Sequence, residues 1–285
     1  MKPAVLYEKN KGKVRCLACA HKCLIADGKR GICSVRENVN GELILLVYGK
    51  LVSMNIDPIE KKPLYNFLPG TKSFSIGTVG CNFRCDFCQN WDISQASKQG
   101  FIGGHDVTPK EVVENAIRAG CRSISYTYNE PVISIEFVRD VAKIAKDKGL
   151  KNIMVTNGYW SQESFNYIRD VIDAVNIDLK GNDKFYKKYC GGNQKPVLET
   201  IKRCHDSGIH VEVTTLVIPG LNDKKEDFEF IAKFIAGLDK NIPWHISRFF
   251  PMYKMTDGKV TPVETLEKAK KIGEKYLEHV YLGNV

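Results

Sequence analysis

The fold is decided by residues 73–88, SFSIGTVGCNFRCDFC, where a strand-like run leads directly into a cluster of cysteines. The run alternates small, polar and apolar residues and ends near two glycines, Gly77 and Gly80, which would let the backbone bend closely around a bound group. Three cysteines then fall within eight residues: Cys81, Cys85 and Cys88. Such a cluster in the loop after a strand predicts a metal site at a sheet edge.

Outward from this stretch, strand-like and helix-like runs alternate. Further strands are expected at 123–129, 151–158, 174–180, 210–220, 243–253 and 279–285. Apolar residues recur at helical spacing in 109–120, 137–149, 163–172, 197–208, 227–238 and 263–277. Thr108–Pro109 and Thr261–Pro262 are expected to open helices. Six strand–helix units and a last strand predict an α/β protein with a partial (β/α)6-type TIM barrel, and a doubly wound open sheet is the alternative.

The first 72 residues follow a different pattern. Residues 36–56 predict a β-hairpin whose turn is Asn40–Gly41. Residues 57–70, DPIEKKPLYNFLPG, contain three prolines and predict an extended connector. We therefore expect two parts, a cysteine-rich N-terminal segment over 1–72 and the barrel over 73–285.

Composition narrows the class of protein. The chain has 285 residues, 43% of them hydrophobic and 26% charged, with no apolar run near the roughly 20 residues that span a bilayer. Its net charge of +9 is spread along the chain without a basic block, so nucleic acid is not an expected partner. The N-terminus lacks the apolar core of a signal peptide. We therefore expect a cytoplasmic protein that does not bind a membrane.

Ten cysteines are many for such a chain, and in a reducing compartment they favour metal over disulfides. Seven of them form two groups, and Cys121, Cys190 and Cys204 are isolated residues expected in the core. A cubane iron–sulfur cluster is closed by one thiolate per iron, so the triad Cys81, Cys85 and Cys88 would leave one iron open. Zinc usually takes a fourth ligand, and none lies nearby in sequence.

The CxxxCxxC spacing with Phe87 before the last cysteine resembles the signature of the radical S-adenosylmethionine (SAM) superfamily. The resemblance extends to SYTYNEP, VTNG, NIDLK, TTLVIPGLND and DPIEKKPLY, and covers nearly the whole chain. Together these motifs are similar to the branch of pyruvate formate-lyase activating enzyme-like proteins, most closely its AmmeMemoRadiSam radical SAM enzymes. The resemblance implies an oxidoreductase in which a 4Fe–4S cluster cleaves SAM to a 5′-deoxyadenosyl radical that abstracts hydrogen. It also implies an external one-electron donor of the flavodoxin or ferredoxin type.

The carboxyl ends of barrel strands carry the active site in such folds, and polar residues recur there. By resemblance, Glu130 after SYTYN binds the amino group of SAM, and Lys180 in NIDLK meets its carboxylate beside Asp178. A Glu–Pro helix start is the alternative for Glu130. The remaining cofactor candidates are Phe87, Asn129, Thr156 and Asn157. Substrate candidates are His245, Arg248 and Tyr253, although His245 also fits a core position.

A second group, Cys16, Cys19, Cys23 and Cys33, supplies four thiolates, enough to close a site. Its spacing fits a structural zinc ion, which would fasten a segment with little core of its own, and equally an auxiliary 4Fe–4S cluster.

Two functions from different classes remain. The first is the radical SAM enzyme, with a macromolecular or small anionic substrate that the sequence does not identify. The second is a cysteine-rich iron–sulfur or zinc module for electron transfer or nucleic-acid binding. An electron carrier has no use for Glu130, Asp178 and Lys180 inside a barrel, which favours the enzyme.

Overall fold

The computed structural model describes residues 1–285 and is organised around one eight-stranded sheet. Seven strands are parallel and neighbour one another in sequence order, as predicted. They are β9 (Lys72–Gly77), β11 (Ser123–Tyr126), β12 (Lys151–Thr156), β13 (Ala174–Asp178), β14 (His210–Val217), β15 (Trp244–Arg248) and β16 (Val280–Gly283). This order contains no reversal, so the doubly wound alternative is wrong and the sheet is a partial barrel.

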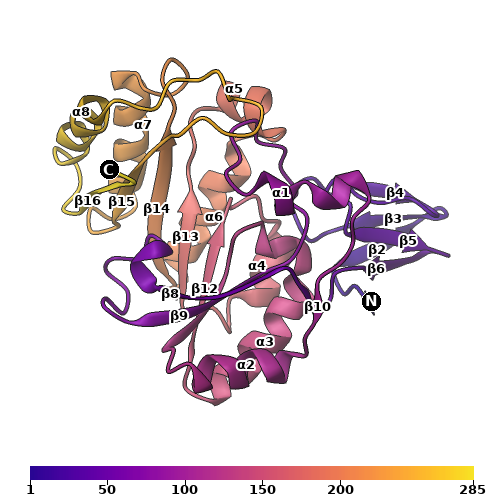
Figure 1. The fold of residues 1–285 in the computed structure, drawn as a ribbon. Coiled ribbons are helices and arrows are strands. Elements are labelled where there is room, and N and C mark those ends of the chain that lie inside the picture. The colour runs from indigo at the N-terminus through magenta and orange to yellow at the C-terminus, as the bar shows by residue number, and fades with distance from the viewer.

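All six predicted helices are present between these strands (Figure 1). They are α2 (Pro109–Arg118), α3 (Ile135–Asp147), α4 (Gln162–Ile168), α6 (Lys195–Asp206), α7 (Lys225–Ala236) and α8 (Val263–Gly273). Shorter helical segments are α1 (Trp91–Ser94), α5 (Asp183–Phe185), η1 (Ile59–Lys61), η2 (Ala96–Gln99), η3 (Pro131–Ser134) and η4 (Tyr186–Cys190). None of the helices is long and apolar enough to cross a membrane.

Both expected helix openings are present, but only the first has a side-chain cap. Thr108 caps α2 in a capping box: its hydroxyl accepts from the backbone N–H of Glu111, whose side chain accepts from the N–H of Thr108. α8 begins directly after Thr261–Pro262, with Pro262 as its N-cap and no side-chain cap. Thr261 instead donates to the carbonyl of Val217 and accepts from the N–H of Phe249, tying two strand ends together.

The sheet has an eighth strand, which the sequence placed in the wrong sheet. β8 (Ser53–Pro58) overlaps the hairpin predicted over 36–56, but it pairs antiparallel with β9, and the hairpin itself is limited to β5 and β6. The predicted boundary between residues 72 and 73 therefore falls inside β9. The connector that follows β8 is anchored at a few buried positions. Ile59 and Leu64 pack with Ile153 and Ala174 in a small buried cluster, and the Glu212 carboxylate accepts from the backbone N–H groups of residues 65 and 66.

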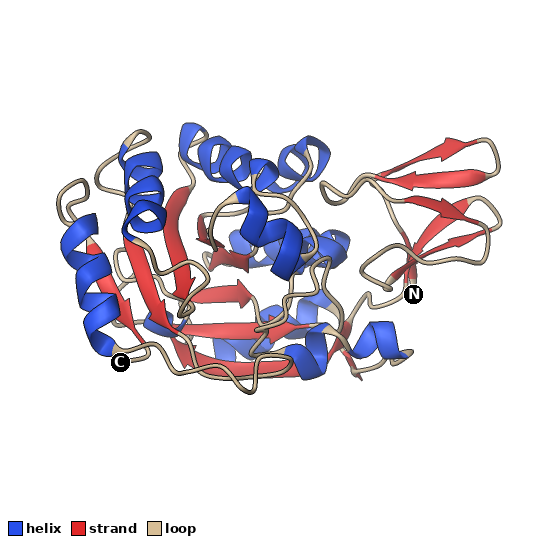
Figure 2. Ribbon diagram, turned by 90° about the horizontal axis from the view of Figure 1, so that it is seen from above, coloured by secondary structure: helices blue, strands red, loops and turns tan.

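The N-terminal segment contains two small antiparallel sheets that lie to one side of the barrel (Figures 1 and 2). One is formed by β1 (Lys2–Pro3), β6 (Glu42–Leu45) and β5 (Arg36–Val39), and the other by β2 (Tyr7–Asn10), β3 (Lys13–Cys16) and β4 (Leu24–Ala26). The predicted hairpin turn is confirmed, with Asn40 and Gly41 both at positive φ, 53° and 82°. A third pair joins β7 (Lys50–Leu51) to β10 (His105–Asp106).

One buried ion pair joins this segment to the barrel. Arg36 on β5 and Glu136 on α3 are each 1% exposed, and the guanidinium donates to both carboxylate oxygens, at 2.9 and 2.5 Å. Its Nε donates to the carbonyl of Ile133 at 2.9 Å. Burial alone would lower the pKa of Arg36 and raise that of Glu136, but their attraction prevails and shifts each pKa in the opposite direction.

We expect Arg36→Met to lower the free energy of unfolding by about 3–5 kcal/mol, because it leaves the Glu136 carboxylate buried without its partner. Urea unfolding monitored by circular dichroism measures this loss. The double variant Arg36→Met/Glu136→Leu should regain most of it, since neither charge is then buried. A loss below 1 kcal/mol in the single variant would contradict this account of the junction.

Candidate iron–sulfur and cofactor site

A cavity of about 890 Å³ opens at the carboxyl ends of the parallel strands. The three cysteines of the triad line it, together with most of the predicted cofactor and substrate residues. These lining residues are Cys81, Cys85, Cys88, Phe87, Asn129, Glu130, Thr156, Asn157, Asp178, Lys180 and His245. Side chains that are up to 164 positions apart in the sequence therefore meet in one space.

The cysteine loop is held tightly to its surroundings. The backbone N–H groups of Arg84 and Asp86 donate to carbonyls of η4, at 2.9 and 3.1 Å. Gly80 has φ of 97°, and a Cβ there would lie 2.7 Å from Val35 and 3.1 Å from the carbonyl of Cys33. Gly80 is therefore required both by its backbone conformation and by the close packing of the N-terminal segment.

The triad has the chemistry expected for a cubane cluster. Three thiols from one loop face one cavity. If they bound a cubane cluster, three of its four irons would each have a thiolate and the fourth would have no protein ligand. No three donor side chains are gathered closely enough to share a single ion. A cubane does not need such a gathering, because it offers each thiolate its own iron. The residues present therefore fit the cluster.

Glu130 is 1% exposed and joins two strand ends. Its carboxylate accepts from the Thr156 hydroxyl and the backbone N–H of Asn157, both at 2.7 Å, and from the N–H of Val132 at 3.0 Å. Because a carboxylate accepts about four hydrogen bonds, one position on Oε2 remains for a ligand. Burial raises the pKa of Glu130 to about 7, although these three hydrogen bonds oppose the rise. The contact with Val132 also caps η3, so the alternative interpretation of Glu130 as a helix start is confirmed.

Two predicted cofactor residues contact the cysteine loop itself. The Asn157 amide donates to Oδ1 of Asn82 at 2.7 Å and lies 3.8 Å from the sulfur of Cys81. The Asn129 amide donates to the carbonyl of Gly80 at 2.8 Å. These contacts fix the position of the loop relative to β11 and β12.

Asp178 and Lys180 form an ion pair at the end of β13, with Nζ and Oδ2 2.7 Å apart. The Lys180 side chain is 11% exposed and its ammonium lies 5.9 Å from the ring centroid of Phe87. Burial by itself would lower the pKa of Lys180, but the Asp178 carboxylate reverses this and raises it. A stable positive charge therefore lines the cavity at the end of β13, two strands along the sheet from β11, which leads to Glu130.

His245 lines the cavity and is anchored in the core. Its Nε2 lies 2.6 Å from Oε2 of Glu212, and its ring packs against Tyr65 and Tyr281 at centroid distances of 4.8 and 5.3 Å. Burial would raise the pKa of Glu212, but hydrogen bonds from His210 and His245 lower it to about 2. His245 is thus a buried core residue that also lines the cavity, and its contact with a substrate stays a prediction.

Arg248 and Tyr253 are not among the residues that line the cavity. Nε of Arg248 donates to the carbonyl of Thr261 at 2.8 Å, and its guanidinium covers the ring of Phe250. Tyr253 stacks on Trp91, with ring centroids 5.3 Å apart. The expectation that both face the substrate cavity is corrected. Arg248 is the last residue of β15, and because side chains alternate along a strand it points away from the face on which Ser247 lines the cavity. Tyr253 lies in the loop beyond β15 and is held by Trp91.

The opposite wall of the cavity holds residues that the sequence did not single out. Lys62, 3% exposed, donates to Oδ2 of Asp57 at 2.7 Å, and the Tyr128 hydroxyl donates to the same oxygen at 2.8 Å. Tyr128 has φ of 71°, which is unusual for a bulky residue. The DPIEKKPLY motif contains Asp57 and Lys62, but only the tertiary structure brings it to the cavity.

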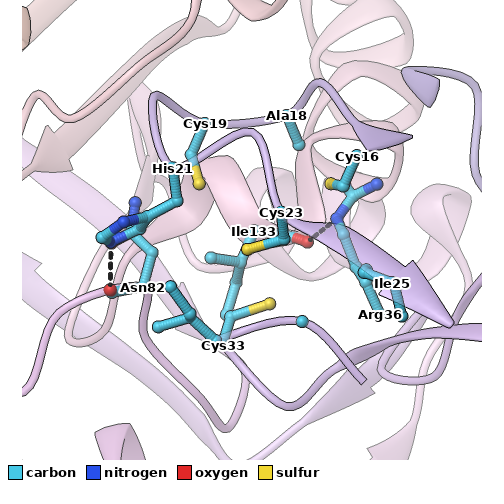
Figure 3. Close-up of a pocket in the computed structure, with 12 residues that line it drawn as sticks. Cys16, Ala18, Cys19, His21, Cys23, Ile25, Cys33, Arg36, Asn82 and Ile133 are labelled. Carbon is cyan, nitrogen blue, oxygen red and sulfur yellow. Dashed lines mark hydrogen bonds between the residues drawn. The ribbon is translucent and has the colours of Figure 1, made fainter. Parts of the chain in front are cut away.

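The N-terminal quartet lies around a second, separate cavity. Cys16, Cys19, Cys23 and Cys33 line a small cavity of about 10 Å³ beside the Arg36 side chain (Figure 3). All ten cysteines are free thiols. Nε2 of His21 lies 2.9 Å from the carbonyl of Asn82, which connects the quartet's loop to the triad's loop.

A family model for the radical SAM superfamily matches residues 75–235, more than half of the chain. The chain belongs to the radical SAM superfamily. An uncharacterized protein of Methanocaldococcus jannaschii is 49% identical over 288 residues, spanning 100% of this chain and 86% of that relative. The pyruvate formate-lyase-activating enzyme of Clostridium pasteurianum is 26% identical in an alignment that covers 70% of this radical SAM chain and 88% of that enzyme.

Solved structures agree in fold. A radical SAM methyltransferase from Sphaerobacter thermophilus has a TM-score of 0.57 at 16% identity, covering 76% of this chain and 67% of its own. A domain of pyruvate-formate lyase-activating enzyme from Bacteroides vulgatus has a TM-score of 0.50 at 19% identity, covering 57% of this chain and 99% of its own. The partial barrel of this radical SAM protein is thus shared with both.

We expect Glu130 to make the metal-free protein less stable as pH rises. Its pKa is higher in the folded protein than in the unfolded chain, so its contribution is fully present below the unfolded value and is lost as pH passes about 7. The unfolding free energy of wild type relative to Glu130→Gln should fall by about 2–3 kcal/mol between pH 5 and 8. Urea titrations at both pH values measure this, and a pH-independent difference would refute the perturbed carboxyl.

Proposed function

We propose that this chain is a radical SAM oxidoreductase that holds a 4Fe–4S cluster on Cys81, Cys85 and Cys88. When bound, the cluster and SAM supply a 5′-deoxyadenosyl radical for hydrogen abstraction. The observation that carries the proposal is the single cavity, in which the three thiols stand beside a buried carboxylate and a buried ammonium. No observation favours the alternative, an electron-transfer or nucleic-acid-binding module. Such a module would not need a cavity lined by a carboxylate and an ammonium.

The chain's own residues suit the two charged ends of SAM. Glu130 retains one acceptor position for an ammonium group, and Lys180 offers an ammonium to a carboxylate. Phe87, 3% exposed, lines the same cavity beside Lys180 and would flank the adenine. Asn129 and Asn157 would act mainly by fixing the cysteine loop, and Thr156 by holding the Glu130 carboxylate, as their hydrogen bonds indicate.

For the substrate, we propose a macromolecular or small anionic molecule that enters beside the wall formed by Lys62, Tyr65 and His245. Lys62 is buried, and its ammonium has donors beyond the one that it gives to Asp57. Relatives bear names of activating enzymes for pyruvate formate-lyase and for glycyl-radical enzymes, so a glycyl loop of a partner protein is the leading case. An external flavodoxin- or ferredoxin-type donor in the cytoplasm would supply the electron.

For the quartet, we propose a second metal site, either zinc or an auxiliary 4Fe–4S cluster. The cavity of about 10 Å³ admits one water-sized particle, which favours a single zinc ion. The thiols are not gathered around one point, which favours a cluster. Elemental analysis of anaerobically prepared protein and of its Cys19→Ser variant would distinguish one zinc from a second complement of iron and sulfide.

Replacing Cys81, Cys85 and Cys88 with Ala should abolish the visible absorption of the reconstituted cluster and all formation of 5′-deoxyadenosine under strong reductant. The cause would be the loss of every thiolate ligand to the catalytic cluster. Cys121→Ala/Cys204→Ala is the matched control, because both residues are buried cysteines outside the cavity. Continued 5′-deoxyadenosine formation by the triple variant would refute the assignment.

Glu130→Gln and Lys180→Met should each weaken SAM binding about ten- to a hundredfold, since a lost charge-assisted contact costs about 1.5–3 kcal/mol. Anaerobic calorimetry on cluster-loaded protein measures the affinity. Glu60→Gln and Lys61→Met are matched controls on the opposite wall of the same cavity and should bind SAM as wild type does. Equal weakening in the controls would mean that the cofactor lies elsewhere in the cavity.

A further inference from the structure

A chain of polar side chains runs from a lysine to the last cysteine of the triad. Its members lie on α1, on η2 and at the single residue between these two short helices, which directly follow the cysteine loop. Nζ of Lys98 donates to Oε1 of Gln95 at 2.8 Å, and Nε2 of Gln95 donates to Oγ of Ser94 at 3.0 Å. Oγ of Ser94 lies 3.3 Å from the sulfur of Cys88. We call these three residues the Lys98–Gln95–Ser94 chain.

The direction of every hydrogen bond in this chain follows from donor chemistry. An ammonium can only donate, so the Gln95 atom facing Lys98 is its carbonyl oxygen. The Gln95 amide nitrogen must then face Ser94, where it donates to the hydroxyl oxygen. Between Ser94 and Cys88 either atom of the free protein could donate. When Cys88 is a thiolate, as cluster ligation requires, its sulfur can only accept, so the Ser94 hydroxyl donates to it.

The surroundings keep these groups in place. Ser94 and Gln95 are 1% and 5% exposed, and Lys98 is half-buried. Lys98 also donates to the carbonyl of Phe83 at 2.7 Å, inside the cysteine loop. In such a setting each hydrogen bond polarises the next, so the charge of Lys98 strengthens the donor that reaches the sulfur.

Building on the cluster assignment proposed above, we propose that the Lys98–Gln95–Ser94 chain raises the reduction potential of the cluster by donating a hydrogen bond to the Cys88 thiolate. Reduction adds one electron from the external donor and increases the negative charge on the thiolate sulfurs. A donor at the sulfur stabilises the reduced state more than the oxidised state, and hydrogen bonds to sulfur are a known control on cluster potential. No proton transfers, and Cys88 remains a thiolate.

The test is a redox titration of the reconstituted cluster without SAM, followed by electron paramagnetic resonance. Ser94→Ala should shift the midpoint potential to a more negative value, and Ser94→Thr, which keeps the hydroxyl, should restore it. Gln95→Leu retains the Lys98 charge but breaks the chain, so a negative shift there separates transmission through hydrogen bonds from the direct field of Lys98. Lys98→Met should shift the potential in the same direction.

Ser97→Ala is the matched control, because Ser97 is buried on the same η2 segment but donates to the carbonyl of Cys33. It should leave the potential unchanged. The iron and sulfide content of each variant is measured to show that its cluster is present. A changed potential is then due to the hydrogen-bond chain and not to loss of the cluster. Absence of a cluster in wild type would refute that assignment. A fully loaded Ser94→Ala or Gln95→Leu variant with the wild-type potential would overturn the role of the chain.

Discussion

Parallel pairing of the barrel strands in sequence order is the constraint on which the rest of this structure depends. Each strand ends beside its predecessor's end, as the pairs Thr156–Ile177 and Asp178–Thr214 illustrate. Consecutive loops therefore rise from one edge of the sheet. This alignment brings three loops to one cavity: the cysteine loop, the loop with the Glu130 carboxylate and the loop with the Lys180 ammonium. These loops need no direct pairing with one another to meet there.

The polar residues of the cavity form hydrogen bonds with one another, independently of any cofactor. Glu130 fixes Thr156 and the backbone of Asn157, and Asn157 in turn reaches Asn82 beside Cys81. The loops after β9, β11 and β12 thereby form one connected unit. Such preorganisation lowers the cost of holding a cluster and a charged cofactor in a fixed relation. It also means that substitutions at these positions alter the cysteine loop as well as any ligand contact.

The N-terminal segment contributes to the same loop from the outside. Its own buried core has only six residues, so it depends on the barrel for much of its stability. The Arg36–Glu136 pair fastens it to α3, while His21 reaches the carbonyl of Asn82 and Cys33 packs against Gly80. A metal bound by the quartet would act on this contact, and through it on the position of the triad.

The sequence by itself determined the seven parallel strands, the six helices between them and the cysteine triad. These features are encoded by local periodicity and by spacing within one loop, which do not depend on distant partners. It also determined which loops carry polar residues, and therefore most of the cavity's lining.

Only the tertiary structure decided where other side chains lie. Most of β8 lies within the predicted hairpin, yet it pairs with β9 of the main sheet, and the connector after it is anchored because apolar Ile59 and Leu64 pack against Ile153 and Ala174. Arg248 is the last residue of β15 and lies on the strand face opposite to Ser247, whereas Tyr253 is in the loop beyond and stacks on Trp91, so neither lines the cavity. The exact end of a strand and the path of the loop that follows it depend on tertiary partners, and neither is contained in local sequence.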